Sequence, residues 1–356
     1  MKRIEFLKQI AFEKNKFDGF LIFNWANLLY FAGFPGAASL LIPQDGESTI
    51  YVYGVNYEQA KAEGKGFRVA LVKRDENLMA KIAQKAKDHK IKKLAVDSLS
   101  IEGWRALAKE TRDETKLKIK SNLIWELRKV KDEEEVALMR KAGELTSEGI
   151  KTAYEALALG MKEYEVAAEI EYAMRKRGSD GTAFETVVAS GARSAFPHGG
   201  CSDREIREGD LVVVDVGATY KFYRSDMTRT LVAGKPSEKQ KRLYETVKAA
   251  QEKAFEVMKP NVKARDVDAA ARKMIEDAGY GECFVHGLGH GVGLEVHEPP
   301  TLNPSSKETL AFGNVVTDEP GIYLVGYGGV RIEDTVLVQK KGAEKLTNAP
   351  YSLGAE

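Results

Sequence analysis

Short apolar runs alternate with helical patterns over the first third of the chain. The apolar runs predict strands at residues 19–23, 39–43, 49–53 and 93–96, and a periodicity near 3.6 residues predicts a helix at residues 77–89. Strands that alternate with helices are typical of an α/β unit. Residues 27–34 fit a strand that runs into a turn, with a ligand loop as the alternative.

A charged stretch at residues 125–135 leads into a long helix that carries Val136, Met139 and Leu145. We place a domain boundary before this stretch. Residues 1–121 then form a small N-terminal α/β domain, and residues 122–356 form a second domain. The length of 356 residues also favours two domains, because it exceeds the size at which one core usually stops growing.

Residues 162–178 and 263–279 form a faint internal repeat at an offset of 101 residues. Each copy predicts an amphipathic helix that ends at glycine, which tolerates the left-handed conformation common at helix ends. Sequence typical of strands follows at residues 182–190 and 283–288. Two such halves predict one pseudo-symmetric domain with a central cleft, although two unrelated amphipathic helices could share the pattern by coincidence.

Two strands around a short turn are predicted at residues 211–218 and 224–231. If the turn centres on residues 220–221, antiparallel pairing puts Asp215 directly opposite Asp226. The Cβ atoms of opposed residues lie about 4.5 to 5.5 Å apart. Two carboxylates held this close repel each other unless protons or cations intervene.

The surroundings of Asp215 also indicate a partner of opposite charge. The residue follows a run of valines, and a buried ion without a partner is very costly. A salt bridge to Arg224 or Arg229 would be the simplest solution, and a bound cation is the other. Thr228 shares the face of the two aspartates by alternation, so its hydroxyl could orient a carboxylate.

Four of the five histidines, His198, His286, His290 and His297, lie in the last 160 residues beside glycine or proline. Residues 286–293 contain too much glycine to form a helix, so the spacing of their histidines does not imply one helical face. These glycines instead allow the backbone to approach a buried centre closely.

Two further patterns in this region do not predict a site of their own. His297 and Glu298 resemble the start of an HExxH motif, but residue 301 is threonine and two prolines prevent the helix that this motif requires. The glycines at 287, 289, 291 and 293 lack the GxGxxG spacing, so nucleotide binding is not expected.

Two more strands are predicted near the end of the chain, at residues 314–323 and 329–338. The first contains Glu319. In the second, alternation places Arg331, Glu333 and Thr335 on one face. Arg331 could therefore be the salt-bridge partner of the carboxylate two residues away.

Together these segments offer four carboxylates and one imidazole, from Asp215, Asp226, His290, Glu319 and Glu333. Four negative charges balance two divalent cations, as a two-metal hydrolytic centre requires. Such ligands suit manganese, cobalt, iron or zinc, and the residues do not distinguish among these metals.

The charge and apolar composition of the chain limit the binding partners that we expect. The chain has 54 basic and 53 acidic side chains, a net charge of +1 that favours neither nucleic acid nor an anionic membrane. The N-terminus does not resemble a secretory signal, and no stretch reaches the roughly 18 apolar residues of a membrane helix. Only two cysteines are present, Cys201 and Cys283, so we expect a reducing, cytoplasmic setting.

Six motifs in order resemble those of a known family. They are the segments 196–200, 226–230 with Asp215, 286–293, 297–298, 319–321 and 331–334. They are similar to the pita-bread-fold metallopeptidases, which include prolidase (Xaa-Pro dipeptidase), aminopeptidase P and methionine aminopeptidase. The resemblance implies an α+β protein, with a small N-terminal α/β domain followed by a pseudo-symmetric pita-bread domain of the creatinase/aminopeptidase type.

The resemblance also implies roles for the five acidic and histidine ligands. Asp215 would chelate one metal, and His290 and Glu319 the other, while Asp226 and Glu333 would bridge both. A hydroxide held between the metals would attack the scissile carbonyl. Glu319 would carry the proton from that water to the leaving nitrogen.

Four further residues match positions that contact the substrate in this family. His198 and His297 would contact the substrate and polarise the oxyanion of the tetrahedral intermediate. His286 and Arg331 would line the leaving-group side, where a proline ring and its carboxylate would sit. One departure is Asp318, where the family usually has an apolar residue. On a strand it would point away from Glu319.

The activity implied is hydrolysis of Xaa-Pro dipeptides by a homodimer. The N-terminal domain is absent from most methionine aminopeptidases, and the length is similar to that of archaeal prolidases. Three alternatives stay open: an Xaa-Pro aminopeptidase acting on longer peptides, a creatinase-like hydrolase that does not depend on metals, and a non-catalytic binding module. The complete ligand set argues against the last two.

Overall fold

A computed structural model of the chain describes residues 2–64, 66–112 and 114–354. These residues divide into two compact units, the first ending at Arg128 and the second beginning at Lys129. The boundary expected between residues 121 and 122 falls near the start of helix α6 (Ser121–Arg128), which belongs to the first unit.

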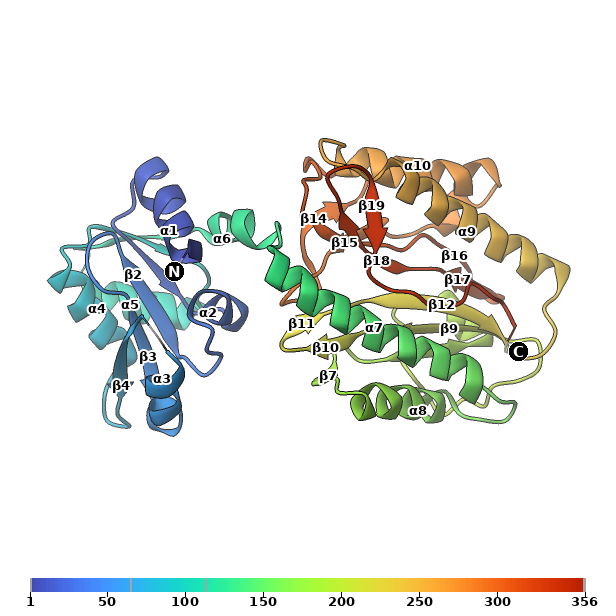
Figure 1. The fold of residues 1–356 in the computed structure, drawn as a ribbon, viewed down its shortest axis with the longest axis horizontal. Helices are drawn as coiled ribbons and strands as arrows, with labels where there is room; N and C mark the ends of the chain where they lie inside the picture. Colours follow the sequence, from blue (N-terminus) through green and yellow to red (C-terminus); the bar gives the residue numbers. More distant parts are fainter. Residues whose placement is uncertain (1, 65, 113, 355–356) are drawn as a thin grey trace. The chain divides into compact units, whose positions relative to one another are not determined.

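The first unit contains a six-stranded mixed sheet. In spatial order its strands are β4 (Arg68–Val72), β3 (Thr49–Tyr53), β2 (Ser39–Pro43), β1 (Gly19–Ile22), β5 (Lys93–Val96) and β6 (Lys116–Ile119). The other helices of this unit are α1 (Lys2–Lys8), α2 (Trp25–Ala32), α3 (Tyr57–Glu63), α4 (Leu78–Asp88) and α5 (Ile101–Thr111). Strand β5 pairs in parallel with β1 and with β6, and helix α5 connects β5 to β6. The predicted α/β character is therefore confirmed (Figure 1).

One prediction in this unit is wrong. Residues 27–34 do not form a strand and a turn, because helix α2 covers most of them. The side chain of Asn24 caps the helix by accepting hydrogen bonds from the N–H groups of Ala26 and Asn27, and Gly33 ends it with a φ of 67°. These two cap residues outweigh the strand-like run of apolar and aromatic residues between them.

Four long helices belong to the second unit: α7 (Glu133–Ala156), α8 (Glu163–Lys176), α9 (Glu238–Val257) and α10 (Ala264–Asp277). The predicted repeat is confirmed, because α8 and α10 have equal length and keep the offset of 101 residues. Gly178 and Gly279 follow them with φ values of 103° and 85°.

The strands of the second unit form four small sheets. One contains β12 (Met227–Val232), β9 (Leu211–Val216) and β8 (Val187–Ser190), and another contains β11 (Tyr223–Arg224), β10 (Ala218–Tyr220) and β7 (Gly181–Thr182). The third contains β14 (Glu298–Leu302), β13 (Gly289–Gly291), β15 (Val315–Asp318), β18 (Asp334–Val338) and β19 (Ala343–Lys345). The fourth is the pair β16 (Gly321–Leu324) and β17 (Gly328–Arg331).

Each helix pair covers its own half of these strands (Figure 1). Helices α7 and α8 pack their apolar residues, such as Ile150 and Ile170, against Val212 and Val214 of β9. Helices α9 and α10 share a second core with β15, β17 and β18. The buried apolar side chains of both cores supply most of the stability, at about 25 cal/mol per Å² of apolar surface removed from water.

The two halves meet where β12 contacts the segment between β17 and β18. Oγ1 of Thr230 donates to the carbonyl of Arg331 at 2.9 Å, and the N–H of Glu333 donates to the carbonyl of Thr228 at 3.0 Å. The predicted strand at residues 329–338 is therefore interrupted at Ile332 and Glu333, where the chain passes from one sheet to the other.

A second predicted strand is also interrupted, since residues 314–323 contain β15, a break at Glu319 and Pro320, and the start of β16. The strand expected at residues 283–288 is absent, and a short 3-10 helix (Gly281–Cys283) and a loop take its place. Among the helices of the described residues, none has the length and apolar character needed to cross a membrane.

Candidate active site

The pairing of β9 and β12 differs from the predicted register. Thr228, and not Asp226, lies opposite Asp215. The turn is formed by Lys221 and Phe222, whose φ values of 45° and 72° are those of a tight two-residue hairpin turn. Because this turn lies one residue later than predicted, the register moves by two residues. Such a shift keeps every side chain on the same face, so both aspartates still point the same way.

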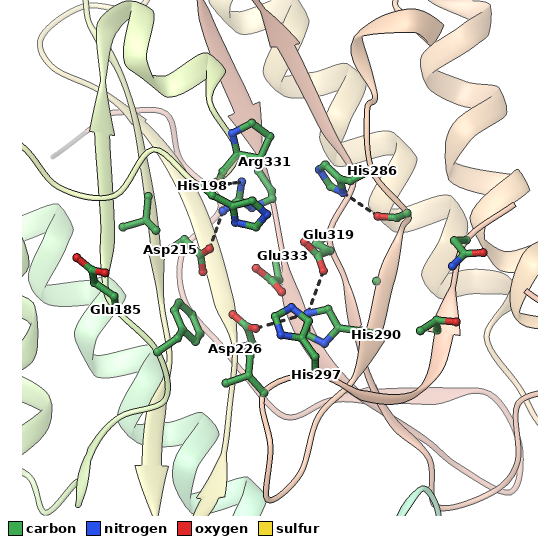
Figure 2. A pocket seen from close by; sticks show the side chains of 18 of the residues that line it. Glu185, His198, Asp215, Asp226, His286, His290, His297, Glu319, Arg331 and Glu333 are labelled. Atoms are coloured by element: carbon green, nitrogen blue, oxygen red, sulfur yellow. Dashed lines mark hydrogen bonds and ion pairs between the residues drawn. The ribbon is translucent and has the colours of Figure 1, made fainter. Parts of the chain in front are cut away.

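All nine predicted site residues line one cavity of about 460 Å³ in the second unit (Figure 2). They come from loops and strands of both halves of the unit, and they are His198, Asp215, Asp226, His286, His290, His297, Glu319, Arg331 and Glu333. Phe184, Glu185, Thr301 and Asn303 also line the cavity and were not singled out from the sequence.

The five predicted ligands converge within this cavity. One ligand atom each from Asp226, His290 and Glu333 lies within 4.8 Å of the other two. Nε2 of His290 is 3.3 Å from Oε1 of Glu319 and 3.8 Å from Oδ2 of Asp226. Figure 2 shows the carboxyl groups of Asp215, Asp226, Glu319 and Glu333 around the same space.

Hydroxyl groups orient several of these ligands. Oγ1 of Thr228 donates to Oε2 of Glu333 at 2.6 Å, as the sequence suggested for a carboxylate on this face. Oγ1 of Thr317 donates to Oε1 of Glu319 at 3.0 Å and accepts from the N–H of His290 at 3.0 Å. Such contacts around a metal ligand limit its rotation and raise its affinity for the ion.

The glycines around His290 allow the backbone to pack closely, as expected. A Cβ atom on Gly289 would lie 2.3 Å from the carbonyl oxygen of Thr317, and one on Gly291 would lie 2.4 Å from that of Pro299. Any larger residue at either position would push β13 away from its neighbours.

Burial and mutual repulsion perturb the titration of this cluster. Burial, followed by the charges of neighbouring carboxylates, raises the pKa of Asp226 and of Glu333 well above the ordinary values. Burial also raises the pKa of Glu319. Burial lowers the pKa of His290, which favours the neutral ring. With Nδ1–H donating to the carbonyl of Gly291 at 3.1 Å, the lone pair of Nε2 faces the acids.

These groups fit a site for divalent cations. Oδ1 of Asp215 and Oδ1 of Asp226 are buried and have no hydrogen-bond partner among the residues that the structure describes. Buried polar atoms are almost always paired, so two unpaired carboxylate oxygens in one acidic cavity indicate a missing positive charge. Oxygen-rich sites with one imidazole suit divalent metals of the first transition row.

Tyr323 is a site residue that sequence reasoning missed. Its hydroxyl lies 2.8 Å from Nε2 of His286 and accepts a hydrogen bond from Nη1 of Arg331 at 3.0 Å. Burial raises the pKa of this hydroxyl to about 12. The chain has 14 tyrosines, and no pattern around residue 323 marks it out from the others.

Arg331 is held by the protein on several sides. Its Nη2 pairs with Oδ2 of Asp215 at 2.6 Å, and its Nε donates to Oγ1 of Thr228 at 3.0 Å. Alternation suggested Glu333 as the salt-bridge partner of Arg331. That suggestion is wrong, because Arg331 pairs with Asp215. Arg229, considered as a partner of the aspartates, pairs with Asp334 at 3.1 Å.

The remaining predicted residues differ in their surroundings. The rings of His290 and His297 lie 4.0 Å apart between centroids, and partial desolvation, followed by the neighbouring His290, lowers the pKa of His297 to about 4. Asp318 is not part of the cavity lining. Within the described part of the chain, both its carboxyl oxygens are buried without a hydrogen-bond partner, on the side expected from alternation.

Comparison with known proteins agrees with this geometry. Residues 137–340 match the model of metallopeptidase family M24, and residues 3–130 match the creatinase/prolidase N-terminal domain. An Xaa-Pro dipeptidase of Pyrococcus horikoshii is 42% identical over 99% of this chain and 97% of its own length.

Two solved structures show the same fold over nearly the whole chain. An Xaa-Pro dipeptidase from Bacillus anthracis has a TM-score of 0.94 and 36% identity, covering 99% of each chain. An X-Pro aminopeptidase from Thermotoga maritima has a TM-score of 0.87 and 38% identity, covering 95% of this chain and 97% of its own. The second unit therefore has the pita-bread fold, as the sequence predicted, and the chain belongs to metallopeptidase family M24.

Proposed function

We propose that this metallopeptidase is an Xaa-Pro dipeptidase that uses two divalent metal ions. The observation that carries the proposal is the convergence of four carboxylates and one imidazole on a single cavity, with an unpartnered oxygen on both Asp215 and Asp226. The Xaa-Pro dipeptidase of Pyrococcus horikoshii, similar over 99% of this chain, supports the choice of substrate.

The proposed ligands are Asp215, Asp226, His290, Glu319 and Glu333. Manganese, cobalt, zinc or iron would suit them, and the ions would supply Lewis acidity and lower the pKa of a coordinated water. Four carboxylates would balance the charge of two divalent ions. The hydrogen bonds from Thr228 and Thr317 fix the orientation of Glu333 and Glu319 for this purpose.

Glu319 is the proposed proton carrier. It accepts a proton from the attacking water and delivers it to the proline nitrogen as the C–N bond breaks. Burial raises the pKa of this carboxyl above its ordinary value. Its hydrogen bond from Thr317 holds one oxygen in place during the transfer.

His198 and His297 are proposed to contact the substrate. Both line the cavity, and His297 is exposed to it. Hydrogen bonds from their rings to the oxygen of the scissile carbonyl would stabilise the charge that develops in the tetrahedral intermediate. Removing one such donor typically costs about 100- to 1,000-fold in rate.

His286 and Arg331 are proposed to form the leaving-group side of the cavity. The Tyr323 hydroxyl between them fixes both side chains, and Arg331 also holds Asp215. Any contact between Arg331 and the carboxylate of a substrate would be made in addition to these bonds. Arg331 therefore couples the position of the leaving group to that of a metal ligand.

Similar proteins include dipeptidases and an aminopeptidase, and these two activities differ in the length of the peptide that is cleaved. The Thermotoga maritima relative is an X-Pro aminopeptidase, so an aminopeptidase is the second candidate. A cavity of about 460 Å³ falls within the range of about 300 to 1,000 Å³ for ligand pockets and has room for a dipeptide.

The test is a panel of peptides with added manganese, cobalt or zinc. We expect cleavage of Ala-Pro and other Xaa-Pro dipeptides, little cleavage of Ala-Ala, and loss of activity with a chelator. Cleavage confined to Ala-Pro-Pro and longer peptides would favour the aminopeptidase. A protein that binds no metal and cleaves neither kind of peptide would rule out both.

A cytoplasmic location and a homodimer are part of the proposal. The free cysteines Cys201 and Cys283 support a reducing compartment. Fractionation of cells and sedimentation of the purified protein would test these two points separately.

A further inference from the structure

A single buried carboxylate holds both ends of the loop that carries His198. Glu163, the first residue of α8, is fully buried. Its Oε1 accepts hydrogen bonds from the N–H and Oγ of Ser190, at 2.7 and 2.8 Å. Its Oε2 accepts from the N–H and Oγ of Ser202, at 2.9 and 2.6 Å. Ser190 ends β8 and Ser202 closes the loop, so one side chain joins its beginning to its end.

The positive charge of Arg193 offsets the cost of burying Glu163, and Arg204 braces Ser190. Nε of Arg193 lies 3.3 Å from Oε2 of Glu163, and Arg193 is itself a residue of this loop. Arg204 forms a two-point ion pair with Asp210, at 2.6 and 3.0 Å, and also donates to Oγ of Ser190. A carboxylate with five donors, one of them the guanidinium of Arg193, is a rigid anchor, because every lone-pair direction is used.

Two arginines contact the backbone on either side of His198, and one of them, Arg193, is itself bound to Glu163. Nη2 of Arg193 donates to the carbonyl of Gly199 at 2.7 Å, directly after the histidine. Nη1 of Arg331 lies 3.4 Å from the carbonyl of Pro197, directly before it. Among the described residues, no hydrogen bond reaches the ring of His198, so the placement of that ring depends on its backbone.

We propose that Glu163 is a positioning residue that holds the loop of residues 190–202 and thereby places His198 in the cavity. Glu163 does not line the cavity and acts through Arg193 and the two serines. The inference rests on the proposed function for the role of His198, but the anchoring of the loop does not.

The first test measures the loop without any substrate. Hydrogen exchange, followed by mass spectrometry, is compared between the parent and Glu163→Gln. The amide of glutamine keeps the shape of the side chain, but its NH₂ group cannot accept from the serines. We expect at least tenfold faster exchange in peptides that cover residues 190–202, and no change in β9. Glu171→Gln, an exposed residue on the same helix, is the matched control and should leave the loop unchanged.

The second test is a double-mutant cycle on Ala-Pro cleavage. Glu163→Gln should lower kcat/KM about tenfold or more while the metal content stays at the parent value. In a His198→Ala background, Glu163→Gln should have less than a twofold effect, because the residue through which it acts is gone. Equal effects in both backgrounds would overturn the proposal, since a general loss of structure adds to any other change.

The outcomes separate this inference from the proposed function. A parent protein that does not cleave Ala-Pro contradicts the function, and the exchange measurement then decides the role of Glu163 alone. Unchanged exchange in the loop overturns the proposal whatever the activity. If Glu163→Gln does not fold, Ser202→Ala removes one of the same hydrogen bonds more mildly. Faster exchange in its loop supports the proposal, and unchanged exchange refutes it.

Discussion

Oγ1 of Thr228 donates a 2.6 Å hydrogen bond to Oε2 of Glu333, and Oγ1 also accepts a hydrogen bond from Nε of Arg331. Thr228 lies opposite Asp215 in the β9–β12 pair. Its hydroxyl contacts two residues that lie more than 100 positions later in the sequence. Together with the bond from Thr317 to Glu319, the bond to Glu333 means that threonine hydroxyl groups hold two of the proposed metal ligands.

Replacing Thr228 by valine should weaken metal binding. Valine keeps the volume but removes the hydroxyl, which leaves Glu333 free to rotate and Arg331 short of one acceptor. Loss of a contact of this kind costs about 10- to 100-fold in affinity or activity. Titration of the apoprotein with manganese, read by calorimetry, measures the effect. Thr246→Val on the exposed face of α9 is the control, and equal affinities in the two variants would contradict the prediction.

Removing the metal should lower the melting temperature of the parent protein. A ligand at 100 times its Kd stabilises a fold by about 2.7 kcal/mol, which in a unit of this size corresponds to a shift on the order of 5 to 10 °C. Glu333→Gln should lose that shift. In chelator, the same variant should melt above the parent, because it has one carboxyl fewer in a cluster where burial, followed by repulsion between carboxylates, raises the pKa of Glu333. Calorimetry with and without chelator tests both statements.

Tyr323→Phe should reduce both activity and stability. The change removes the hydroxyl between His286 and Arg331 and leaves both without that partner, at a cost of about 1 to 3 kcal/mol. We expect kcat/KM for Ala-Pro to fall about tenfold. Tyr172→Phe, on the exposed face of α8, should have no effect. Parent kinetics in Tyr323→Phe would show that the hydroxyl does not position either residue.

Asp318→Asn should stabilise the protein, and the gain should grow with pH. Burial raises the pKa of Asp318 well above its ordinary value, so the folded state keeps a proton that the unfolded state releases. As pH rises above the ordinary pKa near 4, each pH unit costs about 1.4 kcal/mol until the folded carboxyl also ionises. The variant avoids this cost. We therefore expect a gain of more than about 1 kcal/mol at pH 7 and almost none near pH 4.

Urea denaturation across this pH range measures the difference. The control is Asp203→Asn, because Asp203 is exposed and belongs to the same unit. A gain that does not depend on pH would mean that ionisation of Asp318 is not its source.

The local pattern of the chain determined much of this protein. The two repeat helices, the α/β character of the first unit and nine of the residues that line the cavity could all be predicted, because periodicity and ordered motifs are local properties. The alternation around Asp215 also predicted correctly which face the carboxylates share, since a strand repeats every two residues.

Only the tertiary structure decided the partners across that face. A register shift of two residues leaves the alternation unchanged, so the sequence pattern could not distinguish Thr228 from Asp226 as the residue opposite Asp215. The conformation of Lys221 and Phe222 in the turn sets that choice.

The same reason explains why Tyr323 and Glu163 were not found. A tyrosine or glutamate has no special local pattern, and its role arises from side chains that folding brings close. Tyr323 meets His286, which lies 37 residues earlier, and Glu163 meets Ser202, which lies 39 residues later. Contacts over such separations depend on the packing of whole elements, and that packing is a property of the folded chain.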